Sequence, residues 1–317
     1  MTRFILARGV LLLGGLLLST ALIFFTLRVL PGDVAQVIAG TEATPAQIEA
    51  IRARLGLDEP LFVQYLGWLG GLLQGDLGVS YVTGQPVRAE ILAKAQVTIP
   101  LGLLSLLFAT VLSITLGYLA AVHHRGAIGS VISFVAQGVA SVPTLWAGLL
   151  LILLFSLVLG WFPAGGFPRG GWQNPGAALY ALLLPAITAG LVEGAILLRY
   201  VRSSVLEVLS ADYVRTGAAK GLSRRGALLS EGLPNAGLSL FTLFGMQVAT
   251  LIVGAIIIEN LFQLPGLGRM LVADVGARDF SKVQATVFVM TAFVLVLGAL
   301  VDVFQRTLDP QQRLRRA

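Results

Sequence analysis

Cysteine is absent from this 317-residue chain, which excludes disulfide bonds, thiol nucleophiles and cysteine-based metal sites. Charged residues are also scarce: Asp, Glu, Lys and Arg make up 12% of the chain, about half of their share in an ordinary soluble domain. The only two histidines, His123 and His124, are adjacent. Adjacent histidines could bind a metal ion, but we interpret them as part of a polar turn and expect no metal site.

Two catalytic motifs are missing as well. A chain that hydrolyses ATP itself needs a phosphate-binding loop, Gly-x-x-x-x-Gly-Lys followed by Ser or Thr. The three lysines, Lys94, Lys220 and Lys282, are preceded by Ala, Ala and Ser, so this loop is absent. A Gly-x-Ser-x-Gly nucleophile motif is also absent. We therefore expect no catalytic residues and no enzymatic activity on this chain.

Apolar residues are abundant instead. They make up 56% of the chain and are concentrated in long runs. An uninterrupted apolar run of about 18 or more residues predicts a membrane-spanning helix. The predicted fold is therefore an all-α, polytopic membrane protein. We count six transmembrane helices, at residues 10–29, 97–122, 128–159, 177–198, 238–258 and 283–303.

Two of these runs have unusual features. The first follows Met1-Thr2-Arg3, as in a signal peptide, but it is too long for one and no small-residue cleavage site follows it. We expect it to be an uncleaved helix. The third run is longer than one bilayer crossing and contains Pro143, which predicts a kinked or tilted span and an interfacial stretch.

The distribution of charge predicts the orientation. With the amino terminus inside, the inner segments hold thirteen basic and five acidic residues, whereas the outer segments hold nine basic and ten acidic residues. The remaining acid, Glu193, lies within a span. Basic residues favour the cytoplasmic side of a membrane, so both termini are predicted to be cytoplasmic.

The outer segment 31–96 contains signals for short helices. Thr44-Pro45-Ala46-Gln47 is a capping box with Pro at the first helical position, and the helix that it opens is expected to end at Gly56. A second, amphipathic helix is expected after Pro60. We divide the chain into the region 1–30 with the first span, the extracytoplasmic segment 31–96, and a five-helix core 97–317 that includes a cytoplasmic loop at 199–237.

That loop carries six of the 22 Lys and Arg residues of the chain. Gly221 suits a helix end, because glycine tolerates positive φ without steric cost. Ser223 can cap a following short helix. Pro234 ends that helix, because proline lacks an N–H and crowds the preceding turn. The charges alone would fit either a docking helix or an ordinary basic cytoplasmic loop.

The loop resembles the coupling loop of ABC-importer permeases, in which a Glu-Ala-Ala triplet precedes a Gly and then a Leu-Pro. Gly221 and the Leu-Pro at 233–234 match, whereas the triplet falls on Arg-Thr-Gly at 215–217 and lacks its Glu. Asp-Tyr-Val-Arg-Thr at 212–216 and Ala-Lys-Gly-Leu at 219–222 are similar to permeases of the dipeptide, oligopeptide and nickel transport family. Further similar segments are Leu-Pro-Gly-Asp (30–33), Gly-Asp-Leu-Gly-Val-Ser (75–80), Val-Pro-Thr (142–144), Phe-Pro (162–163), Glu-Asn-Leu-Phe (259–262), Pro-Gly-Leu-Gly (265–268) and Leu-Asp-Pro (308–310).

This resemblance implies a multi-pass protein of the bacterial inner membrane that has no cofactor of its own. ATP and Mg would bind to partner subunits. The implied partners are a second, homologous permease chain, one or two nucleotide-binding ATPase subunits, an extracytoplasmic solute-binding protein and membrane lipid, with no nucleic acid; a homodimeric permease is less favoured. The residues expected to couple to the ATPase are Arg215, Lys220, Gly221, Leu222, Ser223, Arg224, Arg225, Leu228 and Leu229.

Three residues are candidates for the translocation path. Glu193 is an acid within a span, where an ionisable group should face protein or a water-filled cavity. It either meets a cationic part of the solute or is a structural residue paired with Arg199 or a nearby amide. Gln137 and Gln247 are polar and bulky, which suits lipid contact poorly, although such residues often bond between helices instead.

The expected function is that of a permease subunit in an ATP-driven importer of di- or oligopeptides, which works by alternating access coupled to a separate ATPase. The same machinery for nickel, glutathione or haem is an alternative. An ion-driven secondary transporter is less favoured, because it would call for broken helices in matching halves and further acids within the spans. The segment 259–280 resembles a re-entrant, scoop-like feature of the family, with a plain outer loop as the alternative.

Overall fold

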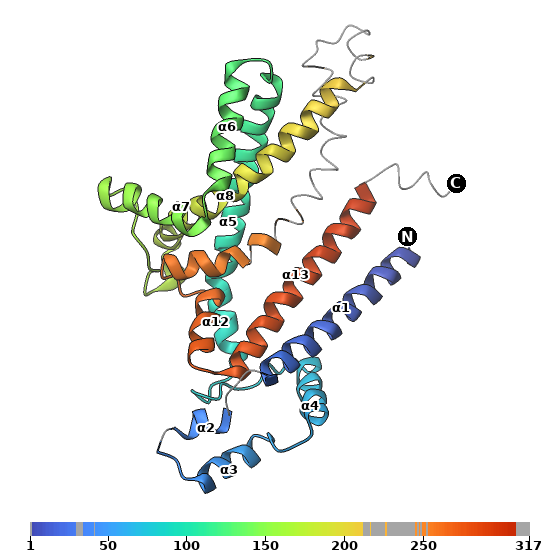
Figure 1. Ribbon diagram of the computed structural model, residues 1–317, viewed down its shortest axis with the longest axis vertical. Coiled ribbons are helices and arrows are strands. Elements are labelled where there is room, and N and C mark those ends of the chain that lie inside the picture. The colour runs from blue at the N-terminus through green and yellow to red at the C-terminus, as the bar shows by residue number, and fades with distance from the viewer. Residues whose placement is uncertain are drawn as a thin grey trace. The chain divides into compact units, whose positions relative to one another are not determined.

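The computed structural model describes residues 2–29, 34–40, 42–211, 216, 226, 245, 247, 249–251 and 253–308. Within these residues the fold is all-α, without a β-strand (Figure 1). Its helices are α1 (Thr2–Val29), α2 (Val34–Ala39), α3 (Pro45–Arg54), α4 (Leu61–Leu73), α5 (Val87–Val122), α6 (Ala127–Ser141), α7 (Thr144–Leu151) with a π-helical continuation (Ile152–Val158), a 3₁₀ turn (Gly171–Gln173), α8 (Pro175–Ser210), the helix Ala249–Leu261, α12 (Leu267–Gly276) and α13 (Phe280–Leu308).

Four of these helices are long and apolar enough to cross a membrane: α1, α5, α8 and α13. The bent pair formed by α6 and α7 with its π-helical continuation adds a fifth candidate. These five correspond to five of the six expected spans. The remaining expected span, 238–258, falls partly outside the described residues, although the apolar helix Ala249–Leu261 overlaps its end. The polytopic fold is therefore confirmed, and the count of six stays a prediction.

The third expected span is broken where the sequence places Pro143. Helix α6 ends at Ser141 and α7 begins at Thr144, and the two directions differ by 104°. Val142 is extended, with φ −83° and ψ 126°, as expected for a residue whose α conformation is hindered by a following proline. Pro143 then starts α7, because the first turn of a helix does not need its missing N–H.

The short helices of the segment 31–96 begin and end close to the expected places. Thr44 accepts a hydrogen bond from the backbone N–H of Gln47, and the Gln47 side chain accepts one from the backbone N–H of Thr44, so the capping box is present. Helix α3 ends at Arg54, and Gly56 in the next turn has a φ of +64°, a conformation that glycine adopts without strain. Helix α4 begins directly after Pro60.

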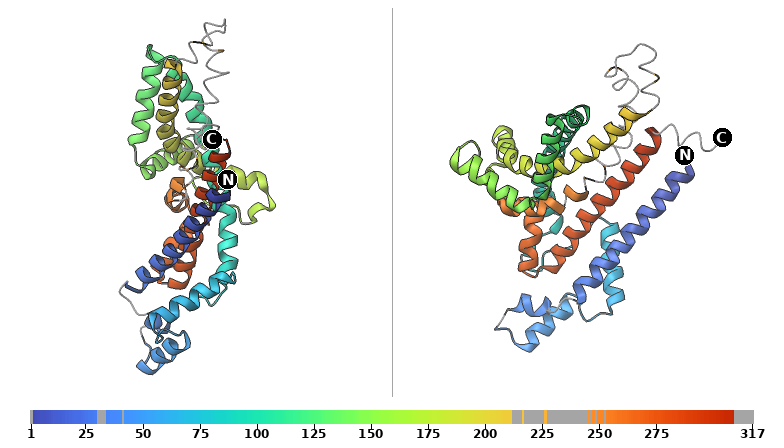
Figure 2. Two further views of the ribbon diagram at one scale, coloured as in Figure 1. Left: turned by 90° about the vertical axis from the view of Figure 1, so that its right-hand side faces the viewer. Right: turned by 45° about the horizontal axis from the view of Figure 1, so that its top comes forward.

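The chain divides into two compact units. Unit 1 consists of Met1–Thr98 and Pro265–Val296, and unit 2 consists of Ile99–Leu264 and Leu297–Ala317. In unit 1, α1 runs alongside the first part of α13 (Figures 1 and 2), and aromatic side chains join α1, α4 and α13. The ring of Trp68 lies 6.1 Å from that of Phe24 and 6.1 Å from that of Phe288.

In unit 2, α8 is the central helix. It lies beside α6 (Figure 1) and contributes many buried side chains, including Leu182, Leu184 and Leu198. Its start is fixed by Asn174, whose side chain accepts a hydrogen bond from the N–H of Ala177, and by Pro175 at the first helical position.

Candidate functional site

Helix α8 carries Glu193 and packs very closely against the part of α5 that belongs to unit 2. A Cβ atom on Gly190 would lie 2.7 Å from the backbone oxygen of Ser105, and a Cβ on Gly194 would lie 3.1 Å from the Cα of Ala109. Glycine at these two positions lets the helix backbones approach each other, as is common between membrane helices. Glu193 lies between Gly190 and Gly194 in the sequence, so this close packing of α8 against α5 fixes its position.

The structure brings two of the three path candidates together. The Nε2 atom of Gln247 donates a hydrogen bond to the Oε2 atom of Glu193, across 54 positions of sequence. Both side chains are partly buried within unit 2. Glu193 therefore has an amide partner, as one of the two interpretations of this residue expects. An acid held by an amide keeps further acceptor capacity, because each carboxylate oxygen has two lone pairs.

Gln137, the third candidate, forms a hydrogen bond with a different residue, Arg199. Its Oε1 atom accepts a hydrogen bond of 3.3 Å from Nη1 of Arg199, and the two side chains are exposed. Gln137 is on α6 and Arg199 is on α8, so this bond links the two helices. Glu193 with Gln247 and Gln137 with Arg199 are thus two separate polar pairs within unit 2.

The expected ATPase-coupling residues fall outside the described part of the chain. They are Arg215, Lys220, Gly221, Leu222, Ser223, Arg224, Arg225, Leu228 and Leu229. What the structure does describe is the helix that leads to them. Helix α8 continues to Ser210, beyond the apolar run 177–198.

The extension of α8 is anchored by its own small core. Val201, Val205 and Val208 are buried and form a cluster with Ala121, near the end of α5. Tyr118 and Val122 of α5 pack against the same cluster. These valines recur at intervals of three and four residues, so they lie on one face of the helix. The extension is therefore packed against α5 rather than projecting alone.

Unit 1 contains a buried ionic cluster that sequence reasoning did not find. The Nζ atom of Lys282 lies 2.7 Å from Oε2 of Glu90 and 2.9 Å from Oδ1 of Asp274. The Lys282 side chain is only 8% exposed and that of Asp274 10%, whereas that of Glu90 is 30% exposed. Burial raises the pKa of Asp274, and the Lys282 ammonium acts in the opposite direction.

A second buried acid of unit 1 organises the neighbouring loop. Asp279 accepts hydrogen bonds from the Ser80 hydroxyl and, at 3.1 Å, from the backbone N–H of Tyr81. Asp279 also accepts a bond of 3.4 Å from the backbone N–H of Lys282, so it fixes the loop at residues 80–81 to the start of α13. No group of His, Asp and Glu residues suited to a metal ion occurs among the residues that the structure describes.

Comparison with known proteins covers nearly the whole chain. Residues 113–314 match the family described as binding-protein-dependent transport system inner membrane component. Residues 1–102 match the family that describes the N-terminal part of such membrane components. The two matches together leave only a short stretch between residues 102 and 113.

Two relatives illustrate the similarity. The chain is 35% identical to the glutathione transport system permease protein GsiC of Escherichia coli over 315 residues, which cover 99% of this chain and 100% of the relative. It is 37% identical over 313 residues to a putative peptide transport system permease protein of Brucella abortus, with 99% of each chain covered. This chain therefore belongs to the binding-protein-dependent transport system inner membrane components, the multi-pass permease subunits of bacterial ABC importers.

Proposed function

We propose that this chain is the permease subunit of an ATP-driven importer of di- or oligopeptides. The observation that carries the proposal is the similarity over the full chain to one permease named for glutathione and one named for peptide transport. Glutathione is itself a small peptide, so the solutes named for the two relatives are chemically similar. Both solutes have an ammonium group, at least one carboxylate and amide bonds.

Glu193 and Gln247 are our proposed contacts for the peptide. An amino terminus is a cation with three N–H donors, and a carboxylate is its strongest acceptor. The bond from Gln247 positions the carboxylate of Glu193 and leaves lone pairs for a ligand. Gln137, bonded to Arg199, is proposed as a further contact on the same path. A guanidinium can hold a peptide carboxylate in two parallel hydrogen bonds.

Coupling to ATP hydrolysis is proposed to pass through the loop 199–237 and the extension of α8. Arg215, Lys220, Arg224 and Arg225 would supply the charged rim of a contact with the ATPase, and Leu222, Leu228 and Leu229 its apolar anchors. The valine cluster with Ala121 supports this assignment, because a packed helix transmits a displacement that a free one would absorb. The closure of two ATPase subunits would then bias the inward- and outward-open states.

The proposed assembly contains a second, homologous permease chain, one or two ATPase subunits that bind ATP and Mg, and an extracytoplasmic solute-binding protein. Both termini and the loop 199–237 are proposed to be cytoplasmic, and the segment 31–96 extracytoplasmic. The sequence regions 1–30, 31–96 and 97–317 would then serve as first span, outer cap and transport core.

Reconstituted transport tests this proposal. The complete importer in proteoliposomes should accumulate dialanine in the presence of ATP, with glutathione and Ni²⁺ tested as alternative solutes. Replacing Gly221 with Val should uncouple ATP hydrolysis from uptake while membrane insertion is retained, because a β-branched residue resists the helix-end conformation. Gly9→Val is the control, because a side chain at Gly9 has open space around it. Transport of Ni²⁺ but not of dialanine would refute the peptide assignment, and full coupling in Gly221→Val would refute the docking assignment.

A further inference from the structure

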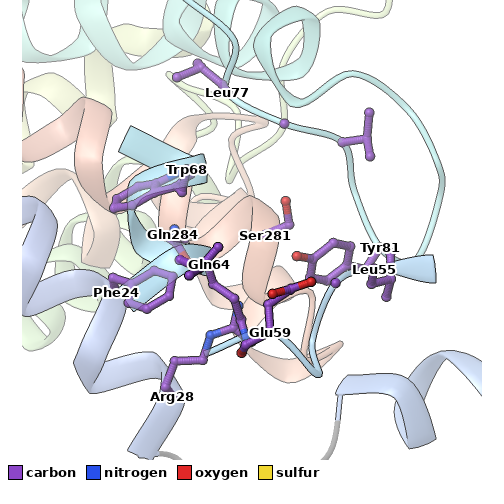
Figure 3. A pocket seen from close by; sticks show the side chains of 15 residues that line it. Phe24, Arg28, Leu55, Glu59, Gln64, Trp68, Leu77, Tyr81, Ser281 and Gln284 are labelled. Atoms are coloured by element: carbon purple, nitrogen blue, oxygen red, sulfur yellow. The ribbon is translucent and has the colours of Figure 1, made fainter. Parts of the chain in front are cut away.

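A pocket of about 410 Å³ lies within unit 1, and none of the path and coupling candidates lines it (Figure 3). Five segments form it: the end of α1, the turn after α3, α4, the loop at 77–81 and the start of α13. Its lining combines one cation, one carboxylate, hydroxyl and amide groups, and three aromatic rings. Phe24, Arg28, Glu59, Trp68 and Tyr81 are among the side chains that line it.

The cationic group of the pocket is Arg28. Its guanidinium carbon lies 5.1 Å from the centre of the Phe24 ring. Within the described part of the chain Arg28 forms no ion pair with an acid. A guanidinium that faces a pocket without a carboxylate partner retains donors for an anion. Arg28 is thus available to an anionic group that enters the pocket.

Tyr81 supplies a second donor near Arg28. Its backbone is held in place by the carboxylate of Asp279, which accepts a hydrogen bond of 3.1 Å from its N–H. Burial raises the pKa of the Tyr81 hydroxyl, whereas the Arg28 cation acts in the opposite direction and Asp279 in the same direction as burial. The hydroxyl therefore stays protonated and can donate beside the guanidinium.

Helix α1 indicates the depth of the pocket in the membrane. Arg28 lies in the last turn of this helix, which is long and apolar enough to cross a membrane. Basic and aromatic side chains at the end of a span lie at the level of lipid headgroups. The nearby helix α4 exposes Phe62 and Val63, and Val79 beside the pocket is half exposed. These exposed apolar side chains suit contact with acyl chains.

We propose that this pocket binds the headgroup of a phosphatidylethanolamine molecule, with the phosphate at Arg28 and Tyr81 and the ammonium at Glu59. The guanidinium and the hydroxyl match the phosphate oxygens, and the Glu59 carboxylate matches the ammonium. Phe24 and Trp68 form an apolar wall beside the glycerol and the upper acyl chain. A peptide also carries both charges, but only a lipid accounts for the exposed apolar side chains at the rim.

Native mass spectrometry of the full-length chain, purified in mild detergent and offered mixed phosphatidylethanolamine and phosphatidylglycerol, tests the proposal. Arg28→Gln should weaken retention of one phosphatidylethanolamine about tenfold, which is the effect expected when a hydrogen bond to a charged group is lost. Tyr81→Phe should weaken it less, and Glu59→Gln should remove the preference over phosphatidylglycerol. Arg88→Gln is the matched control, because Arg88 belongs to unit 1 but is exposed and does not line the pocket.

Three results would overturn the proposal. The first is equal lipid retention in the wild type, Arg28→Gln and Tyr81→Phe, with thermal unfolding confirming that the variants are folded. The second is displacement of the bound lipid by dialanine, which would identify a peptide site. The third is equal binding of glycerophosphoethanolamine, which lacks acyl chains and would show that the lipid body contributes nothing. If Arg28→Gln does not fold, Tyr81→Phe and Glu59→Gln give the comparison, and lipid retention and preference equal to the wild type in both variants would overturn the proposal.

Discussion

Glu193 is the residue on which the proposed peptide contact depends. Glu193→Gln removes the charge but keeps the size of the side chain. Loss of a hydrogen bond to a charged group costs about 1.5–3 kcal/mol, so the KM for a dipeptide should rise by about tenfold or more while insertion and expression are retained. Uptake kinetics in proteoliposomes measure this change.

A matched control is available on another helix. Glu49 is exposed on α3, so Glu49→Gln removes the same charge away from the pair. Its KM should equal that of the wild type. Unchanged uptake of several dipeptides by Glu193→Gln would show instead that the acid has only a structural role.

Lys282 is predicted to stabilise unit 1. In Lys282→Met, Asp274 and Glu90 lose the cation that neutralises them, and breaking such a buried pair costs about 3 kcal/mol. Thermal unfolding in detergent measures the loss. Lys94→Met removes a lysine that forms no ion pair within the described part of the chain, so this variant should unfold close to the wild type. Adding Asp274→Leu to Lys282→Met should restore part of the lost stability.

The pH dependence of this loss has a definite sign. Burial raises the pKa of Asp274 above its ordinary value of 3.8, and without Lys282 only burial and the remaining acids act on it. A group with a raised pKa contributes stability that is present below its unfolded-state pKa and is lost as the pH rises through its folded-state pKa. The difference between Lys282→Met and the wild type should therefore be small near pH 4 and reach its full size near pH 7. A constant difference across this range would contradict the account.

Sequence reasoning found Glu193 because an acid within an apolar run is conspicuous. It could not pair Glu193 with Gln247, because 54 residues separate them and only tertiary packing brings them together. The ionic cluster was missed for a different reason. Glu90 and Asp274 lie in polar segments, where a charged residue is ordinary, and nothing in their spacing indicates a shared cation.

At the scale of helices, the contact between α5 and α8 depends on a missing side chain. A Cβ on Gly190 would overlap the backbone oxygen of Ser105, which cannot rotate away as a side chain can. Gly190→Ala is expected to lower stability by about 1–3 kcal/mol, because overpacking outweighs the gain in helix propensity. Gly102→Ala, where a Cβ meets nothing within 4 Å, should be neutral or slightly stabilising. Equal unfolding temperatures of the two variants would contradict this packing.

Local signals predicted where several helices begin and break. The capping box at Thr44 and the break at Pro143 are confirmed, because each depends on residues close in sequence. The lengths of α5 and α8 were underestimated. An apolar run marks only the part of a helix that crosses hydrocarbon, and α8 continues to Ser210 because valines on one face pack against α5.

At the scale of the molecule, the two units could not be predicted. Residues 265–296 join the first 98 residues in unit 1, although more than 160 residues separate them. Contacts of this kind depend on the tertiary fold and leave no periodic signal. The family, by contrast, was evident from short segments in a fixed order, and the comparisons confirm it.

The orientation is a prediction for the whole molecule, and the absence of cysteine makes it simple to test. In single-cysteine variants, Ala50→Cys on exposed α3 should react with an impermeant maleimide in intact spheroplasts. Thr2→Cys should react only after permeabilisation, because the amino terminus is predicted to be cytoplasmic. The reverse pattern would invert the topology.

We propose that this permease works with a separate ATPase, and purification from the native membrane is the most direct test of that dependence. The chain should be captured in mild detergent and the co-purifying proteins identified by mass spectrometry. A nucleotide-binding subunit and a second, homologous permease chain should co-purify with it. Recovery of this chain alone, under conditions that preserve a known importer complex, would contradict the claim and favour a self-sufficient transporter.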